Sequence, residues 1–298
     1  MSPLTYLINQ IMKAISRAIY LLLLFISNAL SAQTLTTKWT PLLKANLTNW
    51  DVFSGIPNDS LIKAGYPKDV AIGLYKDPLK IFTVEMQESK PVLHVSGELY
   101  GGLSTKDEYE NYHFKTEFKW GEKRYGSRAT QKRDNGILYH ATGEHGKFAL
   151  AWMASQEMQV QETDMGDYYG LSGVTMDIRA SKREPNDKGD WFYNPKAPAR
   201  AFSETNTPTN HCARIQNFEK PRGEWNTLEV ICLGSKSIHV VNGHVVMVLE
   251  NSRIWKDGKE VPLTKGKIQL QSELAECYYR NIQIRQIDKI PAEIAKQL

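Results

Sequence analysis

The chain has 298 residues and a formal net charge of +4 at pH 7. A charge so close to neutral gives no electrostatic footprint for nucleic acid, so we expect no nucleic-acid partner. Its three cysteines, an odd number, do not make a disulfide framework. No CxxC or HExxH spacing is present, so the sequence carries no strong zinc signal.

Residues 1–32 are typical of an export signal. Lys13 and Arg17 form a basic start, residues 18–26 are apolar, and small residues lie just before Gln33. The apolar run is too short for a permanent membrane anchor. Loss of this segment removes both basic residues and lowers the net charge from +4 to +2. We expect a periplasmic or secreted mature protein without stable membrane insertion; a retained N-terminal anchor is the alternative.

Beyond this segment, short strand-like runs alternate with turn residues, which predicts an all-β sandwich or barrel. In residues 111–120 the apolar side chains alternate with polar ones. Asn242-Gly243 predicts a hairpin turn, because both residues accept positive φ. We expect the last two of the predicted strands to form a second pair. The predicted strands are residues 111–120, 225–233, 238–241, 244–249, 267–271 and 277–285.

Two stretches interrupt this pattern. Residues 51–88 carry many turn residues and only one short strand-like run, near residues 79–84. Residues 172–223 are longer and contain a polar, proline-containing centre. Loops of this length are uncommon in a compact domain and often bind ligands. We interpret the second stretch as a rim over the concave face of a sheet, with a tolerated insertion as the alternative. Residues 288–298 predict a short helical turn.

Residues 157–162 read EMQVQE and are the most informative run in the chain. In a strand, Met158 and Val160 would point into a core, whereas the polar residues would line the other face. A bulge would then place Glu162 on the side of Glu157. Carboxylates and amides in a row suit sugar hydroxyls, and two carboxylates can act as acid and base. An ordinary solvated strand face is the alternative interpretation.

Four further residues are candidates for the same site. His140 is a candidate base, metal ligand or electrophile. In a strand it should point to the face opposite Tyr139. The alternative is that it is only hydrogen-bonded, as a lone histidine beside apolar residues more often is. Trp152 is a candidate platform for a sugar ring, with a place in the core as the alternative. Gln271 and Glu273 are candidate sugar contacts, although solvation at a strand end explains them equally well.

The order of short motifs along the chain is informative as a set. They are GGLST at 101–105, EFKWG at 117–121, DNGILYH at 134–140, SQEMQVQE at 155–162, WNTLEV at 225–230, VNG at 241–243, GKIQLQSE at 266–273 and RNI at 280–282. This order resembles the 3-keto-disaccharide hydrolase family (3-keto-glucoside 1,2-lyase / 3-keto-2-hydroxyglucal hydratase). The resemblance covers roughly residues 49–286, and the departures lie mainly in residues 51–89 and 172–223.

The resemblance implies a single domain, residues 33–298, with a concanavalin A-like β-sandwich (jelly roll) whose concave sheet holds a carbohydrate. Glucanase-like sandwiches of that architecture carry a Glu-x-Asp-x-x-Glu strand. Here Glu157, Gln159 and Glu162 have that spacing, with Gln in place of Asp. This substitution speaks against direct glucanase chemistry, and a shared fold alone does not carry function.

The implied substrate is a glycoside oxidised at C3. Its C2 proton is acidic, so a base removes it, the aglycone leaves from C1, and water adds later. Such a site needs a base, an acid and a group that stabilises the enediolate, for which a divalent metal or a neutral donor would serve. Glu157 and Glu162 are the leading acid/base candidates, and Gln159 would orient substrate hydroxyls.

Two other functions remain open at this stage. An ordinary retaining glycosidase would place the carboxyl groups of Glu157 and Glu162 about 5–5.5 Å apart. A non-catalytic carbohydrate-binding module would keep the aromatic platform and the amides without needing either glutamate. In all three cases the expected partner is a carbohydrate.

Overall fold

The computed structural model describes residues 38–184, 190–204 and 209–298, so the expected export signal at residues 1–32 lies outside the described residues. Residues 37–298 form one compact unit. The described part is built mostly of strands, and its helices are all short: α2 (Asp59–Lys63), the 3-10 helix η1 (Gly126–Ala129) and α3 (Ala292–Ala295). None of these helices is long and apolar enough to cross a membrane.

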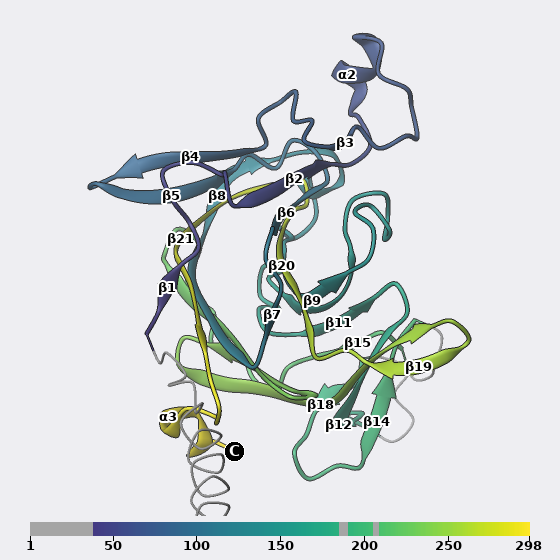
Figure 1. Cartoon of the computed structure of the whole chain (residues 1–298), viewed down its shortest axis with the longest axis vertical. Helices are drawn as coiled ribbons and strands as arrows, with labels where there is room; N and C mark the ends of the chain where they lie inside the picture. The colour runs from purple at the N-terminus through teal and green to yellow at the C-terminus, as the bar shows by residue number, and fades with distance from the viewer. Residues whose placement is uncertain (1–37, 185–189, 205–208) are drawn as a thin grey trace, which may run out of the picture. The chain divides into compact units, whose positions relative to one another are not determined.

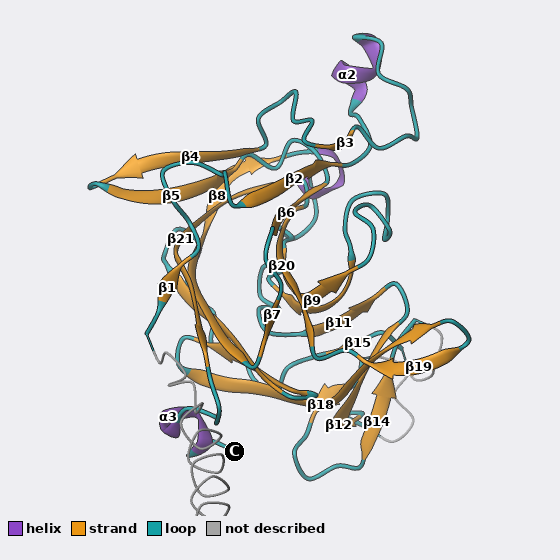
Figure 2. Ribbon diagram, in the orientation of Figure 1, coloured by secondary structure: helices purple, strands orange, loops and turns teal. Residues whose placement is uncertain are grey.

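Two antiparallel sheets form the expected concanavalin A-like β-sandwich, and the larger sheet bends around the smaller one (Figures 1 and 2). The main path of the larger sheet runs, in spatial order, through β13 (Phe192–Tyr193), β12 (Val174–Ser181), β18 (His244–Lys256), β17 (Lys236–Val241), β16 (Asn226–Leu233), β8 (Tyr112–Arg124), β21 (Ala275–Gln286), β5 (Lys90–Val95) and β4 (Phe82–Gln87). Three more strands pair with members of this path: β1 (Thr40–Pro41), β14 (Ala199–Phe202) and β19 (Lys259–Pro262).

The smaller sheet carries residues 157–159 of the polar run EMQVQE, at the end of β10. Its spatial order is β15 (His211–Cys212), β11 (Tyr168–Leu171), β10 (Ala154–Gln159), β9 (Gly136–Thr142), β20 (Lys265–Ser272), β6 (Gly101–Thr105), β2 (Trp50–Ser54) and β3 (Gly73–Leu74), with β7 (Tyr109–Glu110) paired to β20.

The main core lies between the sheets because side chains alternate along each strand. In β8, Phe114, Phe118 and Trp120 are buried, as the alternation of residues 111–120 predicts. From the smaller sheet, Met158 and Val160 belong to the same apolar core, which confirms their predicted direction. The opposite face of β10 is therefore left to Glu157 and Gln159.

The predicted hairpin is confirmed, whereas the predicted second pair is wrong. Strands β17 and β18 pair around Asn242 and Gly243, which have φ values of 51° and 82°. Strand β20, however, pairs with β6 and β9 in the smaller sheet, and β21 pairs with β8 and β5 in the larger. The short link between them crosses from one sheet to the other, and Leu274 makes the turn with a φ of 59°.

Residues 51–88 and 172–223, which the sequence predicts to be mainly loops, contain more strands than expected. The first includes β2 and β3 as well as the predicted strand, which the structure places at β4. In the second, β12 is a full strand of the larger sheet, because Val174, Met176 and Ile178 alternate into a buried cluster. Only parts of this stretch border the cavity described below. The predicted helical turn near the C-terminus is confirmed as α3.

The hairpin turn gives a test of the fold. At Gly243 (φ 82°) an added Cβ would meet no atom within 4 Å, so any cost of substitution comes from the backbone conformation. We predict that Gly243→Ala lowers the free energy of unfolding by about 1 kcal/mol, and that Gly243→Asn costs less because asparagine tolerates positive φ. Urea unfolding of both variants is the measurement, and equal losses would contradict this explanation.

Candidate functional site

A polar cavity of about 490 Å³ lies against the strands β10, β11 and β15 of the smaller sheet. It opens on the sheet face that points away from the main core, since Gln159 and Tyr169 line it. Its volume falls in the range usual for small-molecule sites. The lining residues that matter below are Gln159, Gln161, Asp167, Tyr169, His211 and Arg214.

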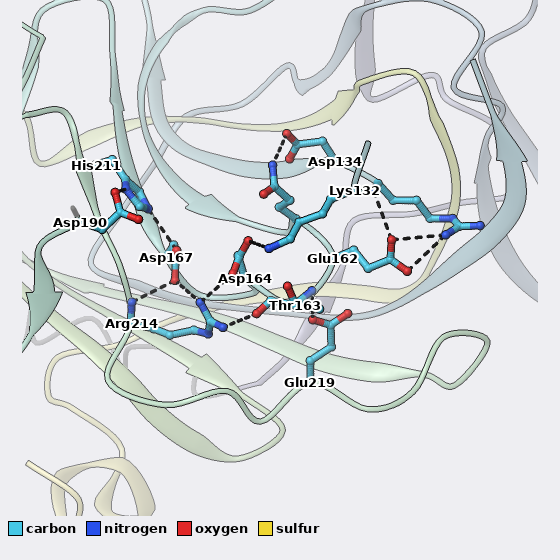
Figure 3. A network of polar contacts seen from close by, with 12 residues as sticks. Lys132, Asp134, Glu162, Thr163, Asp164, Asp167, Asp190, His211, Arg214 and Glu219 are labelled. Atoms are coloured by element: carbon cyan, nitrogen blue, oxygen red, sulfur yellow. Dashed lines mark hydrogen bonds and ion pairs between the residues drawn. The ribbon is translucent and has the colours of Figure 1, made fainter. Parts of the chain in front are cut away.

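Asp167 organises one side of this cavity (Figure 3). Its carboxylate accepts hydrogen bonds from the Arg214 guanidinium (2.7 Å) and the Arg214 backbone N–H (2.9 Å), and it lies 3.1 Å from Nε2 of His211. The other ring nitrogen of His211 lies 3.5 Å from Asp190. Tyr169 stacks on the His211 ring with 4.4 Å between the ring centroids. The result is a flat aromatic surface beside fixed charges.

Gln161 connects the cavity to a buried cluster of carboxyl groups. It lines the cavity, and its amide donates a hydrogen bond of 2.7 Å to Asp134. Asp134 and Glu273 form an isolated β-bridge, and both carboxyl groups are paired with the guanidinium of Arg128. Glu157 completes the cluster without an arginine of its own.

The carboxyl groups of this cluster are poorly solvated. Asp134 is 3% exposed and Glu157 is 4% exposed. Burial raises the pKa of Glu157 well above its ordinary value, and the charges of Glu273 and Asp134 raise it further. Burial also raises the pKa values of Asp134 and Glu273, and Arg128 opposes both shifts. One guanidinium is shared by Asp134 and Glu273, and Glu157 has no basic partner, so the surroundings of the cluster favour the protonated form of Glu157 most.

Four of the six polar candidates from the sequence gather here, around Gly136. Gln159 faces Gly136 across β9 and β10, and Gln271 interacts with Glu157 through its side chain. A Cβ at Gly136 would overlap Oε1 of Glu157 and lie 2.5 Å from Oε1 of Gln271, so glycine makes room for both. The fourth residue, Glu273, joins the cluster through Arg128.

The structure corrects the placement expected for Glu162. Strand β10 ends at Gln159, and residues 162–163 form a turn in which Thr163 has a φ of 74°. There is no bulge that would bring Glu162 beside Glu157. Instead, the Glu162 carboxylate pairs with Arg133 at 3.2 Å and faces Glu219 (Figure 3).

His140 is placed in the core rather than in the cavity. It has a φ of 50° where the pairing of β9 shifts register, so its ring turns toward Tyr112 of the main core. The expectation that it would serve the sugar-binding face is therefore not supported by its position. Burial lowers the pKa of His140 to about 4, which keeps the ring neutral.

Trp152 lies in the core, which was the alternative to its expected role as a platform for a sugar ring. Its indole N–H donates to the Gly101 carbonyl at 2.8 Å, and its ring packs in a small apolar cluster with Leu138 and Phe148. Tyr169 and Phe192 line the cavity instead.

Sequence reasoning missed most of the partners at this site: the basic residues Arg128 and Arg214, and the stacked rings of Tyr169 and His211. Asp134 entered only as part of a motif. His211 and Arg214 lie in the long stretch interpreted as a rim, which was the only signal for them. Among the described residues, no three His, Cys, Asp or Glu side chains are arranged to hold a metal ion.

Comparison with known proteins gives one clear match. Residues 38–285 match the family described as the 3-keto-alpha-glucoside-1,2-lyase-like domain. No curated protein sequence matches the chain.

Solved structures give distant likenesses only. A candidate glycosyl hydrolase from Parabacteroides distasonis ATCC 8503 is 19% identical, with a TM-score of 0.47 over 84% of this chain and 100% of that chain. A protein of unknown function with a galectin-like fold from Bacillus subtilis is 12% identical (TM-score 0.41; 84% and 95% covered). The carbohydrate-binding module CBM66 from Bacillus subtilis is 7% identical (TM-score 0.39; 69% and 92% covered). Likenesses this weak carry no argument about function.

Glu219 gives a pH-dependent prediction at this site. Its carboxylate accepts a 2.6 Å hydrogen bond from the Thr163 N–H, and burial raises its pKa to about 7. The folded protein therefore binds this proton more tightly than the unfolded chain, so stability falls as pH rises from about 4.5 to 7. We predict that Glu219→Gln is more stable than the wild type above pH 7, by about 1–3 kcal/mol, and equal to it below pH 4.5.

Urea unfolding of both proteins across this pH range measures the difference. The amide oxygen of the introduced glutamine would keep the bond to Thr163, so the variant isolates the charge. A difference that does not change with pH would contradict the assignment.

Proposed function

The chain belongs to the family of 3-keto-alpha-glucoside-1,2-lyase-like domains and is a carbohydrate-active protein; on this premise we propose that it is an exported enzyme that cleaves 3-keto-glycosides. The proposed reaction removes the C2 proton, expels the aglycone from C1 and then adds water. The observation that carries the proposal is the buried carboxyl cluster of Asp134, Glu157 and Glu273 beside the polar cavity, in which burial raises the pKa of every member. An elimination needs both a proton donor and a proton acceptor, and in the proposal the cluster supplies both.

The environments of the three carboxyl groups suggest their roles. Titratable groups whose pKa values are pushed apart by their surroundings are the usual acid and base of a site. Glu157 is buried and has no arginine partner, so it is the proton donor of the proposal. Asp134 is paired with Arg128 and bonded to Gln161 at the cavity, so it is the ionised group that accepts the C2 proton. Glu273 shares the charge of Arg128.

The cavity supplies groups that suit a sugar. Gln159, His211 and Arg214 present amide, imidazole and guanidinium groups for hydroxyl oxygens. Tyr169, stacked on His211, offers an apolar ring face to a pyranose. A fixed proton donor near the C3 oxygen would stabilise the negative charge that develops there.

The reaction itself is testable by NMR in D₂O with a 3-keto-disaccharide. We predict that the purified protein releases a keto-sugar with deuterium at C2, because the abstracted proton exchanges with solvent before water adds. A reaction without enzyme is the control, and a parallel reaction with EDTA tests for a metal. Cleavage without C2 deuterium would indicate direct hydrolysis, and binding without cleavage would indicate a carbohydrate-binding module.

The role of Glu157 is testable with an isosteric change. Glu157→Gln removes the proton donor but keeps a neutral side chain of the same shape. We predict a loss of kcat of about 100-fold or more, with an unchanged or higher melting temperature, because burial favours a neutral group at this position.

Glu162→Gln is the matched control, since Glu162 pairs with Arg133 outside the cluster. It should keep kcat within about 3-fold, in line with the small worth of a partly exposed ion pair. If the two variants lost activity equally, the assignment of the acid to the cluster would be wrong.

A further inference from the structure

A second cavity, of about 420 Å³, is lined by Leu274, which directly follows Glu273 of the carboxyl cluster. Its character is opposite to that of the first cavity, because its walls are aliphatic and aromatic. The walls are made by Ile56, Pro57, Leu99, Tyr100, Tyr125 and Leu274. The proposed function leaves this cavity unused.

Two residues of the apolar cavity connect it to the carboxyl cluster. Tyr100 lines it, and the charges of Glu273 and Asp134 help burial to raise the pKa of Tyr100, so its ring lies close to both carboxyl groups. Leu274 also lines the cavity and directly follows Glu273. The chain thus presents a carboxyl group to the cluster and, one residue later, an apolar side chain to the cavity.

A continuous apolar wall joins the two cavities. The buried cluster that contains Leu138 and Trp152 packs against both Tyr100 and Tyr169. Tyr100 belongs to the apolar cavity and Tyr169 to the polar one. Leu138 is paired with Glu157 across β9 and β10. A ligand that lies along this wall would place its middle at the carboxyl groups.

The remaining walls come from the connection between two strands of the smaller sheet. Ile56 and Pro57 belong to residues 55–72, which connect β2 to β3 and contain α2. The rim carries Asp59 and Glu98, two acidic residues without a basic neighbour in the lining. Such a rim disfavours an anionic ligand and accepts a neutral one.

We propose that this cavity is the leaving-group subsite and that it takes a neutral aromatic aglycone, such as a phenol. The proposal rests on the proposed function. The C2–H bond breaks and its proton passes to the base; the electron pair forms the C1–C2 double bond as the C1–O bond breaks. The phenolic oxygen takes a proton from the acid, and water then adds across the double bond. Tyr100 and Tyr125 provide ring faces for the aromatic group.

The first test needs no catalysis. Fluorine NMR reports binding of 4-fluorophenol, the probe, by line broadening. Ser60 is exposed on α2 and lines the cavity, so Ser60→Trp fills the mouth without touching the core. Lys63→Trp puts the same ring on the same helix outside the lining and is the matched control. We expect the wild type and Lys63→Trp to broaden the signal and Ser60→Trp to lose the effect. No binding to the wild type, or equal binding to all three proteins, overturns the subsite.

The second test compares benzyl and methyl 3-keto-glucosides as substrates, because the two leaving alcohols have similar acidity and differ in the aromatic ring. We expect kcat/KM to be about 10-fold or more higher for the benzyl substrate, because an aromatic ring leaves water. Ser60→Trp should remove this preference, and Lys63→Trp, outside the lining, should keep it. Equal kcat/KM for both substrates in the wild type overturns the proposal. If neither substrate is cleaved while 4-fluorophenol still binds in the cavity, the proposed function fails, and the leaving-group role fails with it.

Discussion

The site depends on one electrostatic constraint: three carboxyl groups are buried around a single guanidinium. Isolated ionised carboxylates are too costly to bury, so such groups neutralise or find partners. Arg128 compensates Asp134 and Glu273, whereas burial without a basic partner raises the pKa of Glu157 well above its ordinary value. A structure that keeps this arrangement gives up stability that an apolar cluster would provide. We interpret this loss of stability as the consequence of keeping carboxyl groups that carry out acid–base chemistry.

The β-sandwich provides the scaffold for this constraint. Because side chains alternate, β10 sends Met158 and Val160 into the core and holds Glu157 and Gln159 rigidly on the other face. The neighbouring strands then decide what those side chains meet. Gly136 on β9 leaves space for Glu157, and Gln271 on β20 contacts it from the next strand. A rigid sheet fixes these groups better than loops would.

Sequence periodicity predicted the sandwich, the hairpin at Asn242 and the faces of β8 and β10, because a repeat of two residues directly encodes burial. It failed where a strand ends or bends. Glu162 lies beyond the end of β10, and His140 lies where β9 shifts register with a positive φ. These features depend on hydrogen bonds with neighbouring strands, which a single sequence does not display. The partners Arg128 and His211 were missed for a similar reason, since they reach the site only through the fold.

A buried link between the sheets holds the rim of the cavity in place. His239 on β17 lies 3.0 Å from the Gly166 carbonyl through Nδ1 and 3.1 Å from the Tyr139 hydroxyl through Nε2. Burial lowers the pKa of His239 to about 4, so the ring is neutral. A carbonyl only accepts hydrogen bonds, so Nδ1 carries the proton and Nε2 accepts from Tyr139. This tautomer fixes the turn that ends in Asp167, and the larger sheet therefore supports the site through His239. The His239 side chain holds the backbone on which the charged wall of the cavity is built, because Asp167 in turn fixes His211 and Arg214.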